Sequence, residues 1–478
     1  MKIKRNAAGV IFIVLFSFTK LAGTELPSTC DLLISYLEND NELKKNAIAA
    51  EKARLSLSSA RIDNGFDISL STGTVTIRTD EKGTSFSVKP VVKAKLPQAS
   101  NLTVTASTSY NHMENDSRTE NTQINLSVDI ISPSGLARQV SLLKAERTLT
   151  EATRKLRNQA VTTEKAFYSE LKNLLNSTVN LLNLEKTLYT NQIDFEKIKA
   201  QGYSTGSSTY RLAQMRVIST EHDIENSRRA LTTSYILFYK KCGFTISFDE
   251  GTRGTDPTDF IPSDITEIET INIHDYKPEL YTEVENVIWT NKINSLQRKT
   301  KSTFSLSANG GVTFNNTAAS ADTVDGGLSS TIGGVNLAAG VSLPVNDLNS
   351  PVFTLSATLS PNVFRQNAIT AQTDELSEKE EKINLETAYA NYETKIFECE
   401  QNLEKILWNI KADEESYNMY QNLEKDLAKW YEQGVITESE YYSAKVNAQS
   451  YYVKNIINLI DLIIYNDNIV TMFVEEQI

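Results

Sequence analysis

The longest regular pattern in this sequence is a heptad run from about Asn362 to Glu432, which ends at Gln433-Gly434. No proline interrupts the run, and apolar residues recur at two positions of the heptad. The first position is occupied by Tyr389, Ile396, Leu403, Ile410 and Tyr417, and the second, three residues further on, by Tyr392, Cys399 and Ile406. This spacing predicts a helix packed lengthwise against other helices. About 70 residues, at about 1.5 Å each, would make a helix on the order of 100 Å long.

A second heptad run lies earlier in the chain, between Ser132-Pro133 and Gln201-Gly202, with Phe167, Leu174, Leu181, Leu188 and Phe195 seven residues apart. Pro133 and Pro361 both follow a serine and are 228 residues apart, while Gly202 and Gly434 both follow a glutamine and are 232 residues apart. Self-similarity at this spacing predicts two copies of one unit. Shorter helices are expected at about 28–62, 210–241, 278–299 and 438–474.

Between the helical segments the apolar period changes from near 3.6 to 2, which predicts β-strands and an α+β fold class. The alternating stretches are 66–71, 74–78, 102–106 and 123–128 in the first copy, and 303–314, 334–343 and 352–359 in the second. Their polar positions are mostly Ser, Thr and Asn. Such strands fit a soluble sandwich or a sheet that faces lipid, and alternation does not distinguish the two.

The N-terminus predicts export. Lys2, Lys4 and Arg5 precede an apolar run of about twelve residues, and Ala22-Gly23 follow it, so residues 1–23 are expected to be a signal peptide. The best later candidate for a transmembrane helix, 456–474, is interrupted by Asn and Asp. The net charge of −12 argues against a nucleic-acid partner.

The domain organisation follows from the repeat. After the signal peptide, residues 24–243 form a first repeat of helix, strands, long helix, tip turn and helix, and residues 274–478 form a second. Residues 244–273, with Gly251, Gly254, Pro257 and Pro262, are an irregular equatorial connector. Two units in one chain offer too few neighbours for the long seams, so we expect several chains in a ring.

Three short segments, together with the repeat order, resemble the TolC-like outer-membrane efflux proteins of Gram-negative-type bacteria. Lys277-Pro-Glu-Leu280 is similar to the start of the second repeat in that family, and Gly340-Val-Ser-Leu-Pro344 to the strand that precedes the second long helix. Gln433-Gly434-Val-Ile-Thr-Glu-Ser-Glu440, followed by Ala444, resembles the tip turn. The resemblance covers essentially the whole mature chain.

The resemblance implies a homotrimer in the outer membrane, in which a twelve-stranded β-barrel with four strands from each chain continues as a helical periplasmic tunnel. It implies a passive channel-tunnel for efflux or type I secretion, partnered by a periplasmic adaptor (membrane fusion protein) and an inner-membrane pump. The chain has more alternating sequence than four strands require. We expect the surplus to form long external loops or hairpins; a barrel with more strands is the alternative.

The resemblance also places a gate at the tips. Glu440 matches the first of two acidic positions that line the narrowest opening in the family, and Ser443 occupies the second without a charge. A ring of Glu440 carboxylates would favour cations; alternatively, Glu440 only stabilises a helix start. Gly434 and Gly202 mark the two turns. How the tips are latched closed is left open, because the salt-bridge partners of the family are not evident.

Other candidate sites are few. Cys30 and Cys242 are expected near mid-height of the tunnel, where a disulfide and two free thiols are both compatible with export. His112, His222 and His274 are scattered without metal-ligand spacing, so we expect no metal or other cofactor and no enzyme activity. An exported coiled-coil adaptor and a structural surface protein remain as alternative functions, although neither accounts for the duplication. Substrate and partner pump are not predicted.

Overall fold

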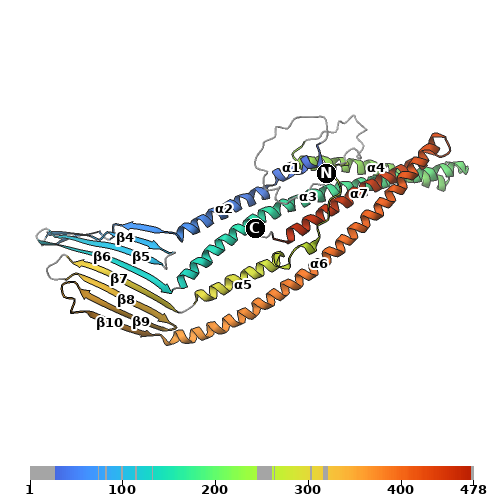
Figure 1. Ribbon diagram of the computed structural model, residues 1–478. Helices are drawn as coiled ribbons and strands as arrows, with labels where there is room; N and C mark the ends of the chain where they lie inside the picture. The colour runs from blue at the N-terminus through green and yellow to red at the C-terminus, as the bar shows by residue number, and fades with distance from the viewer. Residues whose placement is uncertain are drawn as a thin grey trace. The chain divides into compact units, whose positions relative to one another are not determined.

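The computed structural model describes most of the chain (Figure 1): residues 27–73, 75–80, 83–97, 101–113, 116–131, 133–244, 261–262, 264–301, 304–315 and 321–474. The expected signal peptide and residues 245–260 of the connector lie outside the described residues. The chain divides into two compact units, each assembled from both repeats. Of the described residues, those within 1–48, 153–282 and 390–478 form a helical unit, and those within 49–152 and 283–389 form a sheet unit.

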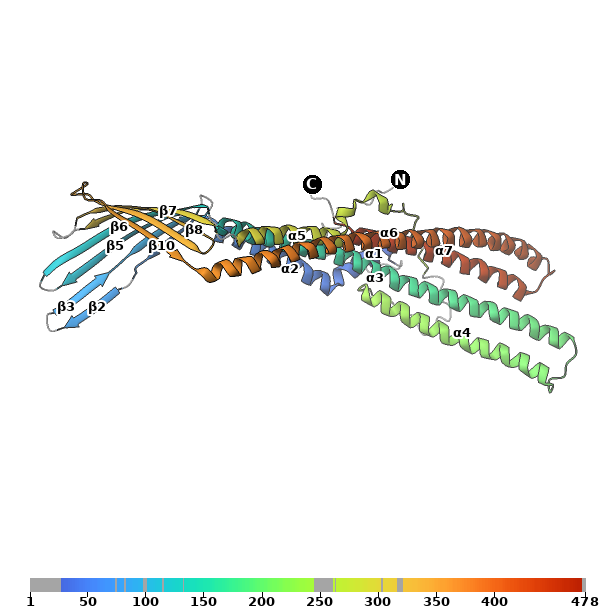
Figure 2. The same cartoon turned by 90° about the horizontal axis from the view of Figure 1, so that it is seen from below.

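The helices follow the predicted two-repeat order: α1 (Thr29–Asn39), α2 (Asn41–Asp63), α3 (Pro133–Ala200), α4 (Ser208–Lys241), the short 3₁₀ helices η3 (Ile273–Asp275) and η4 (Pro278–Leu280), α5 (Thr282–Thr300), α6 (Pro361–Glu432) and α7 (Glu438–Met472). Figure 2 shows two helical hairpins, α3–α4 and α6–α7, each folded back at its turn. None of these helices has an apolar stretch long enough to cross a membrane.

The first helical segment contains a break that the sequence analysis did not predict. Instead of one helix over 28–62, α1 ends at Asn39 with Asp40 as its C-cap, and α2 begins at Asn41. The Asp40 carboxylate accepts hydrogen bonds from the backbone N–H of Glu42 and from the side chains of Gln159 and Thr163 on α3. Burial alone would raise the pKa of Asp40, but these hydrogen bonds outweigh it and lower the pKa. The break therefore attaches the first helical segment to α3.

The helical unit has an apolar core built from both repeats. Phe167 and Leu175 of α3, Tyr235 of α4 and Ile460 of α7 are almost completely buried in it. Residues of both predicted heptad seams are buried or half-buried, which confirms the periodicity: Phe167, Leu174, Leu181, Leu188 and Phe195 on α3, and Tyr389, Tyr392, Ile396, Cys399, Leu403, Ile406, Ile410 and Tyr417 on α6. The described part of the connector packs beside this core, where Asp264 accepts two hydrogen bonds from Thr29.

The sheet unit contains one antiparallel sheet: β1 (Asp67–Ser71), β2 (Val75–Asp80), β3 (Gly83–Val88), β4 (Val91–Leu96), β5 (Leu102–Met113), β6 (Asp116–Ile131), β7 (Ser305–Asn315), β8 (Thr323–Ile332), β9 (Val335–Pro344) and β10 (Val352–Leu359). The strand order is β1-β4-β5-β6-β7-β8-β9-β10, and β2 and β3 lie off this path. Strand β6 of the first repeat pairs with β7 of the second, so the two repeats share the sheet.

Four of the short strands are halves of two long ones. Strands β3 and β4 pair with β5 in the same register. The pairing is interrupted at Lys89-Pro90, because proline has no N–H to donate. Strands β1 and β2 are joined at Gly73, whose φ of +65° and close approach to the Lys89 carbonyl mark a β-bulge. Between Ser71 and Val75 the chain has one residue more than the paired strand has between Val88 and Val91. This extra residue keeps Ile68 and Ile77 on the same face of the sheet. The sheet therefore consists of eight long strands in a simple meander.

This topology corrects the expectation that the surplus alternating stretches form external loops or separate hairpins. Strand β4 pairs with β5 from Val91 to Leu96, and β8 pairs with β7 from Thr323 to Thr331 and with β9 over its whole length. Each repeat thus contributes four long strands to the same sheet. Whether these stretches join one sheet depends on the register between distant segments, and the alternation within each stretch does not predict that register.

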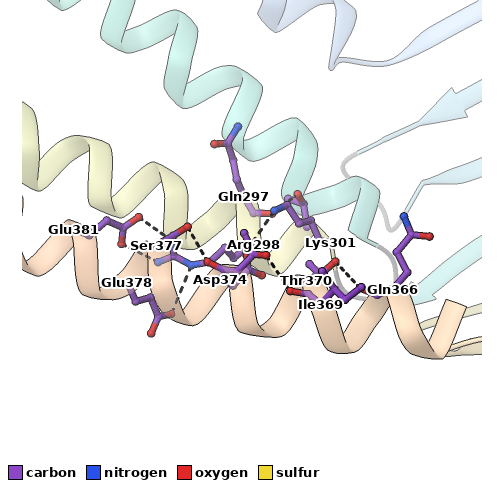
Figure 3. A network of polar contacts seen from close by, with 12 residues as sticks. Gln297, Arg298, Lys301, Gln366, Ile369, Thr370, Asp374, Ser377, Glu378 and Glu381 are labelled. Carbon is purple, nitrogen blue, oxygen red and sulfur yellow. Dashed lines mark hydrogen bonds and ion pairs between the residues drawn. The ribbon is translucent and has the colours of Figure 1, made fainter.

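Ion pairs hold α5 against the first part of α6 (Figure 3). The Arg298 guanidinium donates two hydrogen bonds to the Glu381 carboxylate, at 2.7 and 2.9 Å, and lies 3.6 Å from Glu378. Lys301 pairs with Asp374 at 3.4 Å one turn further on. The hydrogen bonds from Arg298 lower the pKa of Glu381. This network fixes the helix that leaves the sheet against the helix that enters it.

Candidate functional site: a two-faced sheet and two helical turns

One face of the sheet is apolar across all eight long strands. Residues paired across neighbouring strands lie on the same face, and one such row crosses the sheet from edge to edge without a polar side chain: Ile68, Ala94, Val104, Leu126, Gly310, Gly326, Val341 and Phe353. A second row, two residues along each strand, crosses seven strands: Leu70, Val92, Ala106, Ile124, Val312, Val324 and Leu343.

The opposite face is polar. The neighbouring row on that side consists of Asp67, Lys95, Thr103, Ser127, Asn309, Gly327, Gly340 and Thr354. A Cβ at Gly327 would lie 2.7 Å from the Asn309 amide oxygen, and one at Gly340 would lie 2.8 Å from the Thr354 hydroxyl, so a larger residue at either position would displace a polar side chain. The ends of polar side chains from neighbouring strands occupy the space beside these glycines.

The apolar face is exposed in a single copy of the chain. Leu70 is 77 % exposed, Phe353 is 76 % exposed and Leu355 is 84 % exposed. A soluble sandwich would cover such a face with a second sheet or with helices. No second sheet occurs within the described residues. Contiguous apolar surfaces of this kind mark contacts with lipid or with another protein.

The turn after α6 is a Schellman motif with Gly434 in the left-handed conformation, at φ +69°. The N–H of Gly434 bonds to the Tyr431 carbonyl, and the N–H of Val435 bonds to the Trp430 carbonyl. A Cβ on Gly434 would meet no atom within 4 Å. Glycine is therefore favoured here by backbone conformation and not by lack of space.

Glu440 lies in the first turn of α7 as part of a capping box. Its carboxylate accepts hydrogen bonds from the N–H and the hydroxyl of Thr437, both at 2.9 Å, while the Thr437 hydroxyl accepts from the Glu440 N–H at 3.4 Å. The backbone hydrogen bond from Thr437 is the main cause of a lowered pKa for Glu440, and Lys197 adds to it. Glu440 is thus an ionised, exposed carboxylate with a defined structural role in helix capping.

Ser443, at the second acidic position of the family, is half-buried one turn into α7, and its carbonyl accepts a hydrogen bond from Asn447. A tyrosine cluster that the sequence analysis missed lies beside it. Tyr189 of α3 stacks on Tyr442 of α7, which contacts Tyr441, and Tyr441 stacks on Tyr431 of α6. The cluster joins the two helical hairpins near the second turn. The Tyr441-Tyr442 pair is visible in the sequence, but its partners are far away in the chain.

The turn after α3 resembles the second turn in its backbone. Gly202 has φ +77°, and its N–H bonds to the Lys199 carbonyl. Helix α4 then begins at an N-cap serine, Ser207, whose hydroxyl accepts from the N–H of Tyr210. Tyr210 packs edge-on against Phe195 of α3. Both predicted tip glycines therefore occupy helix-ending positions that require positive φ.

Helix α6 carries a second heptad stripe, which is exposed in the part of the chain that the structure describes. Ile369, Leu376 and Ile383 recur every seven residues and are between 61 and 65 % exposed. Phe397 continues the same spacing and is 63 % exposed. An exposed apolar stripe at heptad spacing is the pattern of a helix that packs against another chain.

Cys30 and Cys242 are free thiols in this structure. Cys30 is exposed, whereas Cys242 is completely buried. Burial, with a contribution from Glu170, raises the pKa of the Cys242 thiol to about 12. A buried, protonated thiol is a poor partner for oxidation. Cys399 lies on the α6 seam beside Met472.

Among the described residues, no group of three or more His, Cys, Asp or Glu side chains is placed to hold a metal ion. His274 pairs with Glu400 on the surface at 2.7 Å. The side chain of His112 lies outside the described residues.

The element order is two copies of helix, strands, long helix, turn and helix, which is an α+β fold. Residues 32–265 match the family model described as the TP096X N-terminal domain, and residues 266–476 match the model described as the TP096X C-terminal domain. Because the two models together run through nearly the whole chain, the protein belongs to the TP096X family. The boundary between the models falls inside the segment 244–273.

Among solved structures, the chain is similar to several membrane proteins, including outer-membrane channels. The CmeC outer membrane channel of Campylobacter jejuni is 13 % identical, with a TM-score of 0.45 and coverage of 97 % of this chain and 92 % of that chain. The MtrE outer membrane channel of Neisseria gonorrhoeae in its open state is 13 % identical, with a TM-score of 0.43 and coverage of 91 % and 88 %. A membrane protein from Pseudomonas aeruginosa is 13 % identical, with a TM-score of 0.44 and coverage of 92 % and 89 %. No curated protein matches the sequence.

Proposed function

We propose that this chain is an outer-membrane channel-tunnel, a passive conduit that carries small molecules or polypeptides from an inner-membrane pump to the exterior. The proposed assembly is a homotrimer joined to the pump by a periplasmic adaptor. The sheet is its membrane part, with the apolar face toward lipid and the polar face toward the lumen. The helical hairpins form its periplasmic part.

The apolar face of the sheet is the observation that carries this proposal. It extends over all eight long strands and is exposed, while the neighbouring row on the other face is polar or glycine throughout. Alternation of apolar and polar residues along every strand is what a sheet between lipid and an aqueous lumen requires. Strands β5 to β10 are 8 to 16 residues long, close to the length of about 9–11 residues that a tilted strand needs to cross a bilayer.

The exposed heptad stripe of α6 supports assembly with other copies of the chain. Ile369, Leu376 and Ile383 are apolar like the buried seam of the same helix, but they are largely exposed in a single copy of the chain. In a ring, the helix of the next copy would cover them. The same arrangement would line up the eight-stranded sheets of neighbouring copies.

We place the periplasmic mouth of the conduit at the two turns. Gly202 and Gly434 would form its rim, Glu440 would supply a ring of negative charge, and Ser443 would lie one turn further in. The tyrosine cluster of Tyr189, Tyr431, Tyr441 and Tyr442 supports a closed state, because it holds the two hairpins of one chain together through aromatic contacts.

Reconstitution tests the function directly. The purified protein should require detergent to stay in solution and should run on gels as an oligomer that heating converts to monomer. In planar bilayers it should conduct ions. A matched control is the double variant Leu70→Asp and Leu355→Asp, which puts charge on the apolar face and should fail to insert.

A protein that is soluble without detergent, monomeric and silent in bilayers would overturn this proposal and favour the exported adaptor. An oligomer that is soluble and silent would favour the structural surface protein.

A further inference from the structure

The two edges of the sheet are open. Within the described residues, β1 pairs only with β4, β2 only with β3, and β10 only with β9. Every residue of β1 and of β10 is exposed. An open edge presents unpaired N–H and C=O groups, and proteins that keep such an edge free usually protect it with lysine, proline or an inward-pointing charge. Strand β10 has none of these.

The two edge strands, β1 and β10, are suited to pair with each other in strand direction and in the placement of their apolar side chains. The eight long strands alternate in direction along the meander, so the first and the last are antiparallel. The apolar row that begins at Ile68 on β1 ends at Phe353 on β10. A β10 edge placed beside the β1 edge of a second copy therefore continues both the antiparallel ladder and the apolar face.

We propose that all eight long strands of each copy enter the membrane in one barrel, which closes by pairing β10 of one copy with β1 of the next. This inference rests on the channel function proposed above. In a trimer, three copies of eight strands give 24 strands, where the resemblance to TolC-like proteins implied twelve. Barrel diameter grows roughly in proportion to strand number. The lumen at the outer membrane would then be about twice as wide as that of a twelve-stranded barrel.

The bulge at Gly73 supports the membrane position of the first two strands. Without the extra residue, Val75 and Ile77 of β2 would point to the face opposite Ile68 and Leu70. With it, the apolar residues of β1 and β2 share one face along the whole length from Asp67 to Asp80. An external hairpin in water would gain nothing from keeping this face apolar.

Cross-linking tests the pairing of the edges. In a Cys30→Ser background, Ser69→Cys on β1 is combined in turn with Thr354→Cys, Ser356→Cys or Thr358→Cys on β10. All four positions lie on the polar face, and the three β10 positions cover neighbouring registers. Mild oxidation in proteoliposomes should yield covalent dimers and trimers and nothing larger, because the ring closes.

The matched control for cross-linking combines Ser69→Cys with Ser329→Cys, which lies on the same face in the middle of the sheet and should stay monomeric. Absence of cross-links in every β10 pair, from a protein that still inserts and conducts, would overturn the pairing and leave the channel function intact. Loss of insertion and conduction in the Cys30→Ser parent would instead count against the channel function.

Lipid contact tests the first two strands separately. Leu70→Trp places an indole on the apolar face of β1, and Ser69→Trp places one on the polar face beside it. Brominated phosphatidylcholine should quench most of the added emission of Leu70→Trp, as it should for Leu355→Trp on β10, and little of that of Ser69→Trp. Quenching at Leu355→Trp without quenching at Leu70→Trp would show that β1 lies outside the bilayer and would overturn the eight-stranded contribution.

Discussion

Replacing Glu440 by glutamine separates the two roles that this residue can have. The capping box uses the carboxylate as an acceptor for the N–H and hydroxyl of Thr437. Glutamine at this position of a helix can accept the same hydrogen bonds. The substitution therefore removes the charge and keeps the cap.

The cost to stability should be small. A negative charge in the first turn of an exposed helix contributes about 0.3–1 kcal/mol through the helix dipole, and Glu440 is exposed. The effect on ion binding should be larger if Glu440 lines the mouth. A carboxylate about 4 Å from a divalent cation in water contributes about 2 kcal/mol, which corresponds to a roughly thirtyfold change in Kd.

The assay is divalent-cation block in single-channel recordings, together with thermal unfolding of the same preparations. Glu440→Gln should weaken block at least about tenfold while Tm changes little. Glu438→Gln is the matched control, because it removes a charge from the same helical turn without altering the capping box. Unchanged block in Glu440→Gln would refute the gate and leave Glu440 as a helix cap alone.

The pH dependence follows from the lowered pKa of Glu440. Hydrogen bonds from Thr437 hold this pKa below its ordinary value of 4.5. The carboxylate that stabilises the cap and attracts cations is therefore fully present above pH 4.5, and both effects should be lost only as pH falls through the lowered pKa. Block that disappears already between pH 7 and pH 5 would point to a different group.

Three further predictions address the fold. Gly434→Ala should lower the free energy of unfolding by about 1 kcal/mol and Gly434→Asn by less, because Asn tolerates positive φ better; equal losses in thermal unfolding would contradict this account. Arg298→Met should cost about 2–3 kcal/mol by leaving the half-buried Glu381 carboxylate without its two hydrogen bonds, and Arg298→Lys should cost less. Since the pKa of Glu381 is lowered, this difference should be present at neutral pH and vanish as pH falls through that pKa. A maleimide should label Cys30 in the native protein and Cys242 only after denaturation, because the Cys242 thiol is buried with a pKa of about 12; mass spectrometry showing native labelling of Cys242 would refute its burial.

Much of the helical part could be predicted from residues close together in the chain. Helix α6 runs from Pro361 to Glu432, against a predicted run from about Asn362 to Glu432, because its heptads are regular and Gly434 ends it. The break at Asp40 was missed because the partners that stabilise it, Gln159 and Thr163, lie more than a hundred residues away.

The positions of the two helical turns were predictable from the sequence, whereas the contacts around them were less so. Gly202 and Gly434 were found because positive φ at a helix end leaves a strong local signal. The role of Glu440 in the capping box was also readable from the spacing Thr-x-x-Glu. The tyrosine cluster needed the fold, since Tyr189 and Tyr442 meet only when two distant hairpins pack together.

The sequence by itself determined the two long helices, the repeat and the alternation of each strand, because periodicity is a property of neighbouring residues. Tertiary structure decided how the strands combine. Alternation at Ile124 and at Val312 is the same whether these residues pair with each other or belong to separate hairpins, and only the hydrogen-bonded register joins them. The apolar face over eight strands and the two open edges exist because of that register.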